Sequence, residues 1–155
     1  ERSAIQKALE KTSVPVMVVE NDTYNILNAA DLVWLASGTA TLEAALLQKP
    51  MVIVYRMAWL TYGLARLLVR VKHIGMVNII AGERVVPELI QGELTSERIF
   101  HESEKILLNS GLRAQTIHKL ASVKEKLGTP GAAGRVAEIA FSMIADNVGA
   151  GAMGR

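Results

Sequence analysis

The stretch DLVWLASGTATLEAALLQKPMVIVY, residues 31–55, decides the fold of this chain. It contains two short apolar runs, LVWLA at 32–36 and MVIVY at 51–55, which are typical of strands buried on both faces. Between them, TATLEAALLQ at 39–48 is rich in helix formers, and Lys49-Pro50 ends the predicted helix. A strand, a helix and a second strand in this order predict two parallel strands joined by a crossover helix.

The same alternation extends upstream of residue 31. PVMVVE at 15–20 is β-branched and is followed by turn formers, which predicts another strand, while 2–11 and 24–29 suit short helices. Apolar strands separated by helices indicate a parallel sheet covered on both faces, so we predict an α/β fold with a Rossmann-like parallel sheet. Three strands make a small sheet, and we expect the others upstream of a chain that begins without an initiator Met.

The second half of the chain is mainly helical in its pattern, with a glycine-punctuated stretch at 74–82. The predicted helices cover residues 58–71, 84–91, 96–109, 112–127 and 133–147. We expect residues 1–148 to form one partial domain and residues 149–155 to form a mobile tail.

Composition excludes several kinds of protein and site. With 155 residues, 50% of them hydrophobic and 21% charged, the chain can bury one core and is not disordered. It has no cysteine, and its three histidines are not at metal-ligand spacing, so we expect no disulfide, thiol chemistry or metal. The 17 basic and 15 acidic residues leave a net charge of +2, which gives no reason to expect nucleic-acid binding.

The turn Ser37-Gly38-Thr39 lies between the strand 32–36 and its helix, at the carboxyl end of the sheet, where open α/β sheets bind ligands. Gly38 allows close approach, Ser37 and Thr39 supply hydroxyl donors, and the helix N-terminus favours a phosphate. Glu43 follows Thr39 by one helical turn, where a pair of ribose hydroxyls would suit its carboxylate. The alternative is that the turn only caps the helix and that Glu43 is solvated.

Three phosphate-binding motifs are missing from the sequence: the P-loop, the glycine-rich dinucleotide fingerprint and the D-x-D pair that holds a metal. A diphosphate at this turn would therefore be neutralised by the helix dipole and by arginine. Arg56 follows the strand 51–55 at the same edge and could bind a phosphate bidentately, or could form an ion pair with Glu43 or Glu83. Asn78 lies in an apolar run, where its amide must be hydrogen-bonded, and capping of the turn before Gly82 is the structural alternative.

Residues 44–82 contain no Asp or Glu but include five basic residues. The predicted helix 58–71 combines two of these arginines with aromatic and aliphatic residues, which is typical of a helix at an anionic membrane surface. The residues expected to contact membrane or acyl chains are Trp59, Leu60, Leu64, Arg66, Leu67 and Arg70. The alternative is a core or dimer face. The charge-free runs are too short to span a membrane.

Together these segments resemble the C-terminal part of the lipid-A-disaccharide synthases, bacterial glycosyltransferases with two Rossmann-like domains (GT-B). The resemblance runs from about Val14 to Ile99 and is densest in ASGTATLEAALLQKPMVIVYRM, 36–57, and NIIAGERVVPELIQ, 78–91. Val77 departs from the family pattern, which has proline before the asparagine. The resemblance implies that this chain is a partial UDP-sugar-binding domain and that the N-terminal domain is missing from it.

The resemblance implies transfer of 2,3-diacylglucosamine from its UDP-activated form to 2,3-diacylglucosamine 1-phosphate, giving the β-1,6-linked lipid A disaccharide 1-phosphate and UDP. It implies no cofactor. The implied UDP-binding residues are Ser37, Gly38 and Thr39 at the diphosphate, Glu43 at the ribose, and Gln91. Arg56 and Asn78 are the implied catalytic residues of the donor site. The general base belongs to the family's N-terminal domain, so we expect this chain alone to be inactive.

The resemblance also implies a place in bacterial lipopolysaccharide synthesis, in the cytoplasm and peripheral on the inner face of the inner membrane, and a possible homodimer. Two alternatives stay open. One is another GT-B enzyme that uses UDP-N-acetylglucosamine, a transferase or a 2-epimerase, against which the segment 78–91 argues. The other is a nucleotide-binding or membrane-docking module without catalytic activity.

Overall fold

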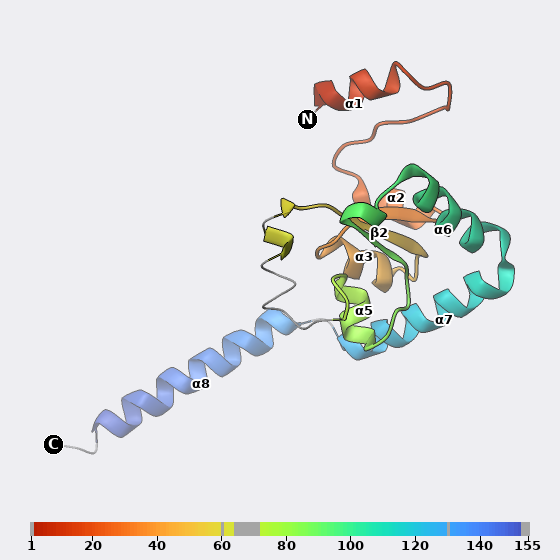
Figure 1. Cartoon of the computed structure of the whole chain (residues 1–155). Helices are drawn as coiled ribbons and strands as arrows, with labels where there is room; N and C mark the ends of the chain where they lie inside the picture. Colours follow the sequence, from red (N-terminus) through yellow and green to blue (C-terminus); the bar gives the residue numbers. More distant parts are fainter. Residues whose placement is uncertain (1, 60, 64–71, 130, 153–155) are drawn as a thin grey trace.

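The computed structural model describes residues 2–59, 61–63, 72–129 and 131–152 (Figure 1). The strands are β1 (Val33–Ala36), β2 (Met51–Tyr55) and β3 (Glu88–Ile90), and β3 is followed by the 3₁₀ turn η1 (Gln91–Glu93). The helices are α1 (Arg2–Leu9), α2 (Thr23–Ala29), α3 (Ala40–Leu46), α5 (Met76–Ala81), α6 (Ser96–Leu108), α7 (Ser110–Leu127) and α8 (Ala132–Ala152).

The three strands form one sheet in the order β1-β2-β3, and both pairings are parallel. In the register of the sheet, Ala36 lies opposite Val54, and Tyr55 lies opposite Ile90. The predicted α/β class with a parallel sheet is therefore confirmed, and all three strands present their carboxyl ends at the same edge.

The prediction of a strand at residues 15–20 was wrong. Residues 15–20 form no strand, and their apolar side chains are exposed; β3 lies instead within 84–91, where a helix was predicted. Pro87 cannot continue a helix, and its carbonyl accepts a hydrogen bond from the N–H of Ile53 at 2.9 Å, which starts the pairing with β2. Strand formation depends on a neighbour to pair with as well as on β-branched composition, so the local pattern pointed to the wrong segment.

The sheet is covered on both faces, as its apolar strands predict. One cluster joins β2 to α3, α5 and α7 through fully buried side chains that include Met51, Ile53, Val77 and Leu120. A second, smaller cluster packs α6 on the opposite face, where Ile106 meets Val52 and Leu89. The site residues at the sheet edge are thus carried by a packed α/β core.

The helices after residue 95 follow the prediction within a few residues, but α8 continues to Ala152 and so enters the segment expected to be a tail. Residues 153–155 lie outside the described residues. Figure 1 shows α1 and α8 extending away from the α/β body, and the apolar side chains of α8, such as Val136 and Ile139, are exposed. Within the described ranges, no helix is both long and apolar enough to cross a membrane.

Candidate functional site

The carboxyl ends of the three strands bring the predicted site residues together. Ser37 directly follows β1, Arg56 follows β2, and Gln91 follows β3. Because the strands are parallel and in register, these three residues lie along one border of the sheet, called here the carboxyl edge. The predicted juxtaposition of the Ser37 turn with Arg56 therefore follows from the observed topology.

The turn 37–39 is not explained by helix capping, because neither Ser37 nor Thr39 makes a side-chain cap of α3. The hydroxyl of Ser37 donates instead to the carbonyl of Ile74, at 3.0 Å, and so tethers the turn to the loop before α5. Gly38 has a φ of 156°, a value that L-residues rarely adopt, and a Cβ there would meet open space. The hydroxyl of Thr41 donates to the carbonyl of Gly38 at 2.7 Å and fixes the turn from the helix side.

The outward donors of this turn are mainly backbone groups. Ser37 was expected to offer its hydroxyl as a donor, but in this conformation its proton is directed at Ile74. The N–H groups of Gly38, Thr39 and Ala40 have no partner among the described residues. Thr39 is exposed, so its hydroxyl is also accessible. An anion at the turn would meet a set of N–H groups and one hydroxyl.

Glu43 is exposed on α3, one turn after Thr39, to whose carbonyl its N–H donates at 3.2 Å. The spacing on one helix face is as predicted, and the exposure leaves the carboxylate accessible to a ligand or to water. Contact of Glu43 with a ribose stays a prediction.

Arg56 is exposed at the carboxyl edge, and its Nη2 donates to the carbonyl of Leu94 at 3.1 Å. The alternative of an ion pair with Glu83 does not hold, because Glu83 pairs with Lys119 at 2.6 Å. A guanidinium has five N–H donors, so one contact with a carbonyl leaves most of them available.

Gln91 holds the backbone next to Arg56. Gln91 is 4% exposed, and its side-chain amide makes two hydrogen bonds to the backbone of Met57. Oε1 accepts from the N–H of Met57 at 3.0 Å, and Nε2 donates to the carbonyl of the same residue at 2.9 Å. The contact of Gln91 with UDP stays a prediction, and the observed bonds give it a role in fixing the chain after β2.

Asn78 is fully buried, and its amide uses all four of its main hydrogen-bonding positions inside the fold. Oδ1 accepts from the N–H groups of Val85 and Val86, at 2.8 and 3.0 Å. Nδ2 donates to the carbonyl of Val86 at 2.9 Å and to Oε1 of Glu88 at 2.8 Å. The structural alternative named for Asn78 was capping of the turn before Gly82, but its amide instead bonds residues beyond that glycine, between Val85 and Glu88.

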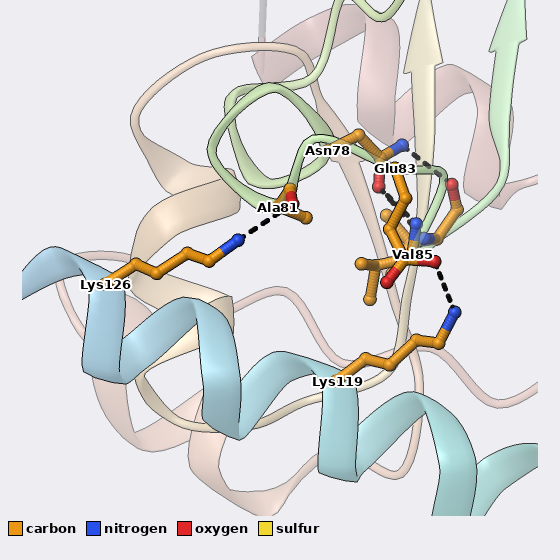
Figure 2. Close-up of polar contacts among 7 residues, drawn as sticks. Asn78, Ala81, Glu83, Val85, Lys119 and Lys126 are labelled. Atoms are coloured by element: carbon orange, nitrogen blue, oxygen red, sulfur yellow. Dashed lines mark hydrogen bonds and ion pairs between the residues drawn. The ribbon is translucent and has the colours of Figure 1, made fainter.

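The same turn is held from α7, as Figure 2 shows. Nζ of Lys119 pairs with Glu83, while Nζ of Lys126 donates to the carbonyl of Ala81, at 2.9 Å. A cation at the carbonyl end of α5 also interacts favourably with the helix dipole. Together with Asn78, these lysines fix the loop that leads into β3.

Glu88 is a residue that the sequence analysis missed. It is 7% exposed at the start of β3, and its carboxylate accepts hydrogen bonds from the N–H groups of Ile74 and Gly75 and from Asn78. The signal that could have found it is an acid inside the apolar run VVPELI, the same signal that singled out Glu43.

The expected membrane-contacting residues are only partly described. Trp59 is 71% exposed and packs edge-on against Tyr62, with ring centroids 6.2 Å apart and an interplanar angle of 87°. Residues 59 and 61–63 are helical. The other expected contacts, Leu60, Leu64, Arg66, Leu67 and Arg70, lie outside the described residues. In the described part of the chain there is no group of three or more His, Cys, Asp or Glu side chains that could hold a metal ion.

The family model described as lipid-A-disaccharide synthetase matches residues 1–139 of this chain. The chain belongs to the lipid-A-disaccharide synthetase family. This match confirms the resemblance noted in the sequence. The matched residues include the whole carboxyl edge described above.

Three relatives, each named lipid-A-disaccharide synthase, illustrate the similarity. The protein of Geobacter sulfurreducens is 43% identical over 144 residues, which are 93% of this chain and 38% of the relative. That of Anaeromyxobacter dehalogenans strain 2CP-1 is 42% identical over 139 residues, 89% of this chain and 36% of the relative. That of Myxococcus xanthus is 39% identical over 144 residues, with coverage of 93% and 38%. The chain thus spans little more than a third of the length of these relatives.

Proposed function

We propose that this chain provides the UDP-binding part of a lipid-A-disaccharide synthase. The reaction would transfer 2,3-diacylglucosamine from its UDP-activated form to 2,3-diacylglucosamine 1-phosphate, with release of UDP. The observation that carries the proposal is the meeting of the Ser37 turn, Arg56 and Gln91 at the carboxyl edge of a chain from this family.

Charge stabilisation is the chemistry that these residues would supply. As the bond between sugar and phosphate breaks, negative charge grows on the departing UDP. The N–H groups of residues 38–40 and the guanidinium of Arg56 are fixed before the reaction and would stabilise this charge more than that of the bound donor. We assign no general base to this chain.

The remaining predicted residues divide into two groups. Glu43 would accept hydrogen bonds from the ribose hydroxyls, since its carboxylate is exposed on the same helix face as Thr39. Gln91 and Asn78 would support the site without contacting the ligand. The amide of Gln91 is bonded to the backbone of Met57, and that of Asn78 to residues 85–88. We therefore propose both as positioning residues of the donor site.

The lipid character of the substrates also suggests a membrane contact. We propose that residues 59–70, including the exposed Trp59, contact acyl chains or an anionic membrane surface, with the enzyme in the cytoplasm at the inner face of the inner membrane. A homodimer is part of the same proposal.

Calorimetric titration of the chain with UDP tests the proposed function, with ADP as the matched nucleotide control. Saturable binding of UDP that is at least tenfold tighter than that of ADP supports a uridine-nucleotide site. Absence of UDP binding at millimolar concentration contradicts the proposal. If the chain then still binds anionic vesicles, it is a docking module.

A second titration separates the substrate classes. UDP-2,3-diacylglucosamine should bind more tightly than UDP-N-acetylglucosamine if the apolar residues near Trp59 contact acyl chains. Equal affinity for the two would favour another enzyme that uses UDP-N-acetylglucosamine.

A further inference from the structure

Glu88 is a buried carboxylate that is stabilised by N–H groups. Its Oε2 accepts from the N–H of Ile74 at 3.0 Å, and its Oε1 accepts from the N–H of Gly75 at 3.0 Å and from Nδ2 of Asn78 at 2.8 Å. No ion pair of Glu88 occurs among the residues that the structure describes. A buried charge held in this way requires every one of these donors, so the loop before α5 is tied to it.

The peptide group between Ile74 and Gly75 connects Glu88 to Ser37. Its N–H, which belongs to Gly75, donates to Glu88, and its carbonyl, which belongs to Ile74, accepts the hydroxyl proton of Ser37 at 3.0 Å. The hydrogen bonds therefore form a continuous chain from the hydroxyl through one peptide group to the carboxylate. In such a chain each bond polarises the next, so the negative charge strengthens the carbonyl as an acceptor for Ser37.

Gly75 makes the close approach of this peptide possible. A Cβ at this position would collide with Cδ1 of Ile53 and would lie 3.1 Å from Oε1 of Glu88. Asn78 fixes the carboxylate from the other side and is itself held by the N–H groups of Val85 and Val86. The packed core under the carboxyl edge therefore fixes the positions of the Glu88 carboxylate, the Ile74–Gly75 peptide and the Ser37 hydroxyl.

We propose that Glu88 is the positioning residue of the ligand-binding turn: through the Ile74–Gly75 peptide it holds the Ser37 hydroxyl inward and so fixes the turn 37–39 for the nucleotide. This inference rests on the proposed function, since it takes the turn to bind UDP. In this proposal Glu88 contributes to UDP binding without touching the ligand. The hydroxyl proton of Ser37 is used in the hydrogen bond to Ile74 and not in a bond to UDP. The ligand then meets the N–H groups that follow Ser37, and not its hydroxyl proton.

A double-mutant cycle on UDP affinity tests the proposal. Ser37→Ala removes the end of the hydrogen-bond chain and should weaken UDP binding about five- to tenfold. Glu88→Gln keeps the shape of the side chain but turns an NH₂ group toward at least one of its three N–H partners, and should weaken binding by a similar factor. If Glu88 acts through Ser37, then Glu88→Gln changes the affinity of the Ser37→Ala variant less than twofold.

Asp31→Asn is the control, because Asp31 is an exposed acid that pairs with Arg113 before β1, at the other end of that strand from the turn 37–39. It should leave UDP affinity unchanged. Multiplication of the two single effects in the double variant would show that Glu88 only stabilises the fold, and would overturn the proposal. An unchanged affinity of Glu88→Gln would overturn it as well.

An NMR measurement keeps the proposal testable if Glu88→Gln does not fold. In Ser37→Ala, the amide proton of Gly75 should move upfield, because its carbonyl partner loses the hydroxyl and the shared peptide group becomes less polarised. The amide of Ile74 also donates to Glu88 but belongs to the preceding peptide group, so it should move less. A Gly75 amide that does not shift would overturn the proposal. Failure of the unmutated chain to bind UDP would instead contradict the proposed function, and the Gly75 shift would still decide the coupling.

Discussion

The side-chain amide of Gln91 pairs with both backbone groups of Met57, and so replaces the strand neighbour that β2 would need at this point. Arg56 lies between the end of β2 and this anchored residue, and its guanidinium reaches Leu94 on the far side of η1. The segment after β3 therefore holds the backbone of Met57 and the side chain of Arg56.

Replacement of Gln91 by glycine should destabilise the chain by about 1–3 kcal/mol, because the N–H and carbonyl of Met57 lose their partners in a half-buried place. Gln91 has a φ of 52°, so glycine removes backbone strain and the loss is attributable to the amide. UDP affinity should fall too, since the chain at Arg56 is loosened. Denaturant unfolding and calorimetry measure the two effects.

Gln48→Gly is the matched control for this substitution. Gln48 has a φ of 55° at the end of α3, and among the described residues it makes only backbone hydrogen bonds. Glycine there should be neutral or stabilising by up to about 1 kcal/mol. If Gln91→Gly is as stable as Gln48→Gly, the amide of Gln91 does not support Met57.

The strands β1 and β2 and the turn that follows β1 could be predicted because each is a short continuous run of residues, apolar in the strands and turn-forming in Ser37-Gly38-Thr39. The strand β3 could not, because PELI becomes a strand only where Ile53 offers its N–H to Pro87. The exposed segment 15–20 shows the converse, since its β-branched residues have no neighbour to pair with in the described chain.

The candidate site was likewise predictable only in part. The meeting of Ser37 and Arg56 follows from the parallel order of β1 and β2, so the sequence was sufficient to predict it. The place of Gln91 depends on β3, which the sequence pattern did not predict. The partners of Asn78 and Gln91 are backbone groups distant along the chain, and no spacing pattern indicates them. The apolar run around Glu88 could have singled out this acid, but its partners, the N–H groups of Ile74 and Gly75, leave no trace in the sequence.

Arg56→Ala should weaken UDP binding tenfold or more while changing the free energy of unfolding by less than about 0.5 kcal/mol, since the side chain is exposed. In a full-length synthase of the family, the corresponding substitution should lower turnover by one or more orders of magnitude. Arg113→Ala is the control, because Arg113 pairs with Asp31 before β1, at the opposite edge. Near-normal affinity and turnover without Arg56 would remove it from the mechanism.

Gly75→Ala should destabilise the chain by about 1–3 kcal/mol, because the added Cβ collides with Cδ1 of Ile53. Ile53→Val removes that atom, so the double variant should recover about 1 kcal/mol relative to Gly75→Ala alone. Gly92→Ala adds a Cβ in open space and should be neutral. Thermal unfolding of the four variants measures the coupling, and strict additivity would contradict the observed packing.

Asn78→Ala distinguishes a positioning role from direct contact with the substrate. Loss of the amide leaves Val85, Val86 and Glu88 short of partners in a buried place, and we expect a destabilisation of about 3 kcal/mol or more. Asn25→Ala removes an exposed amide that donates to the exposed Asp22, and should cost less than about 0.5 kcal/mol. If Asn78→Ala instead unfolds like the unmutated chain and loses only UDP affinity or turnover, then Asn78 contacts the substrate, as the family resemblance implied.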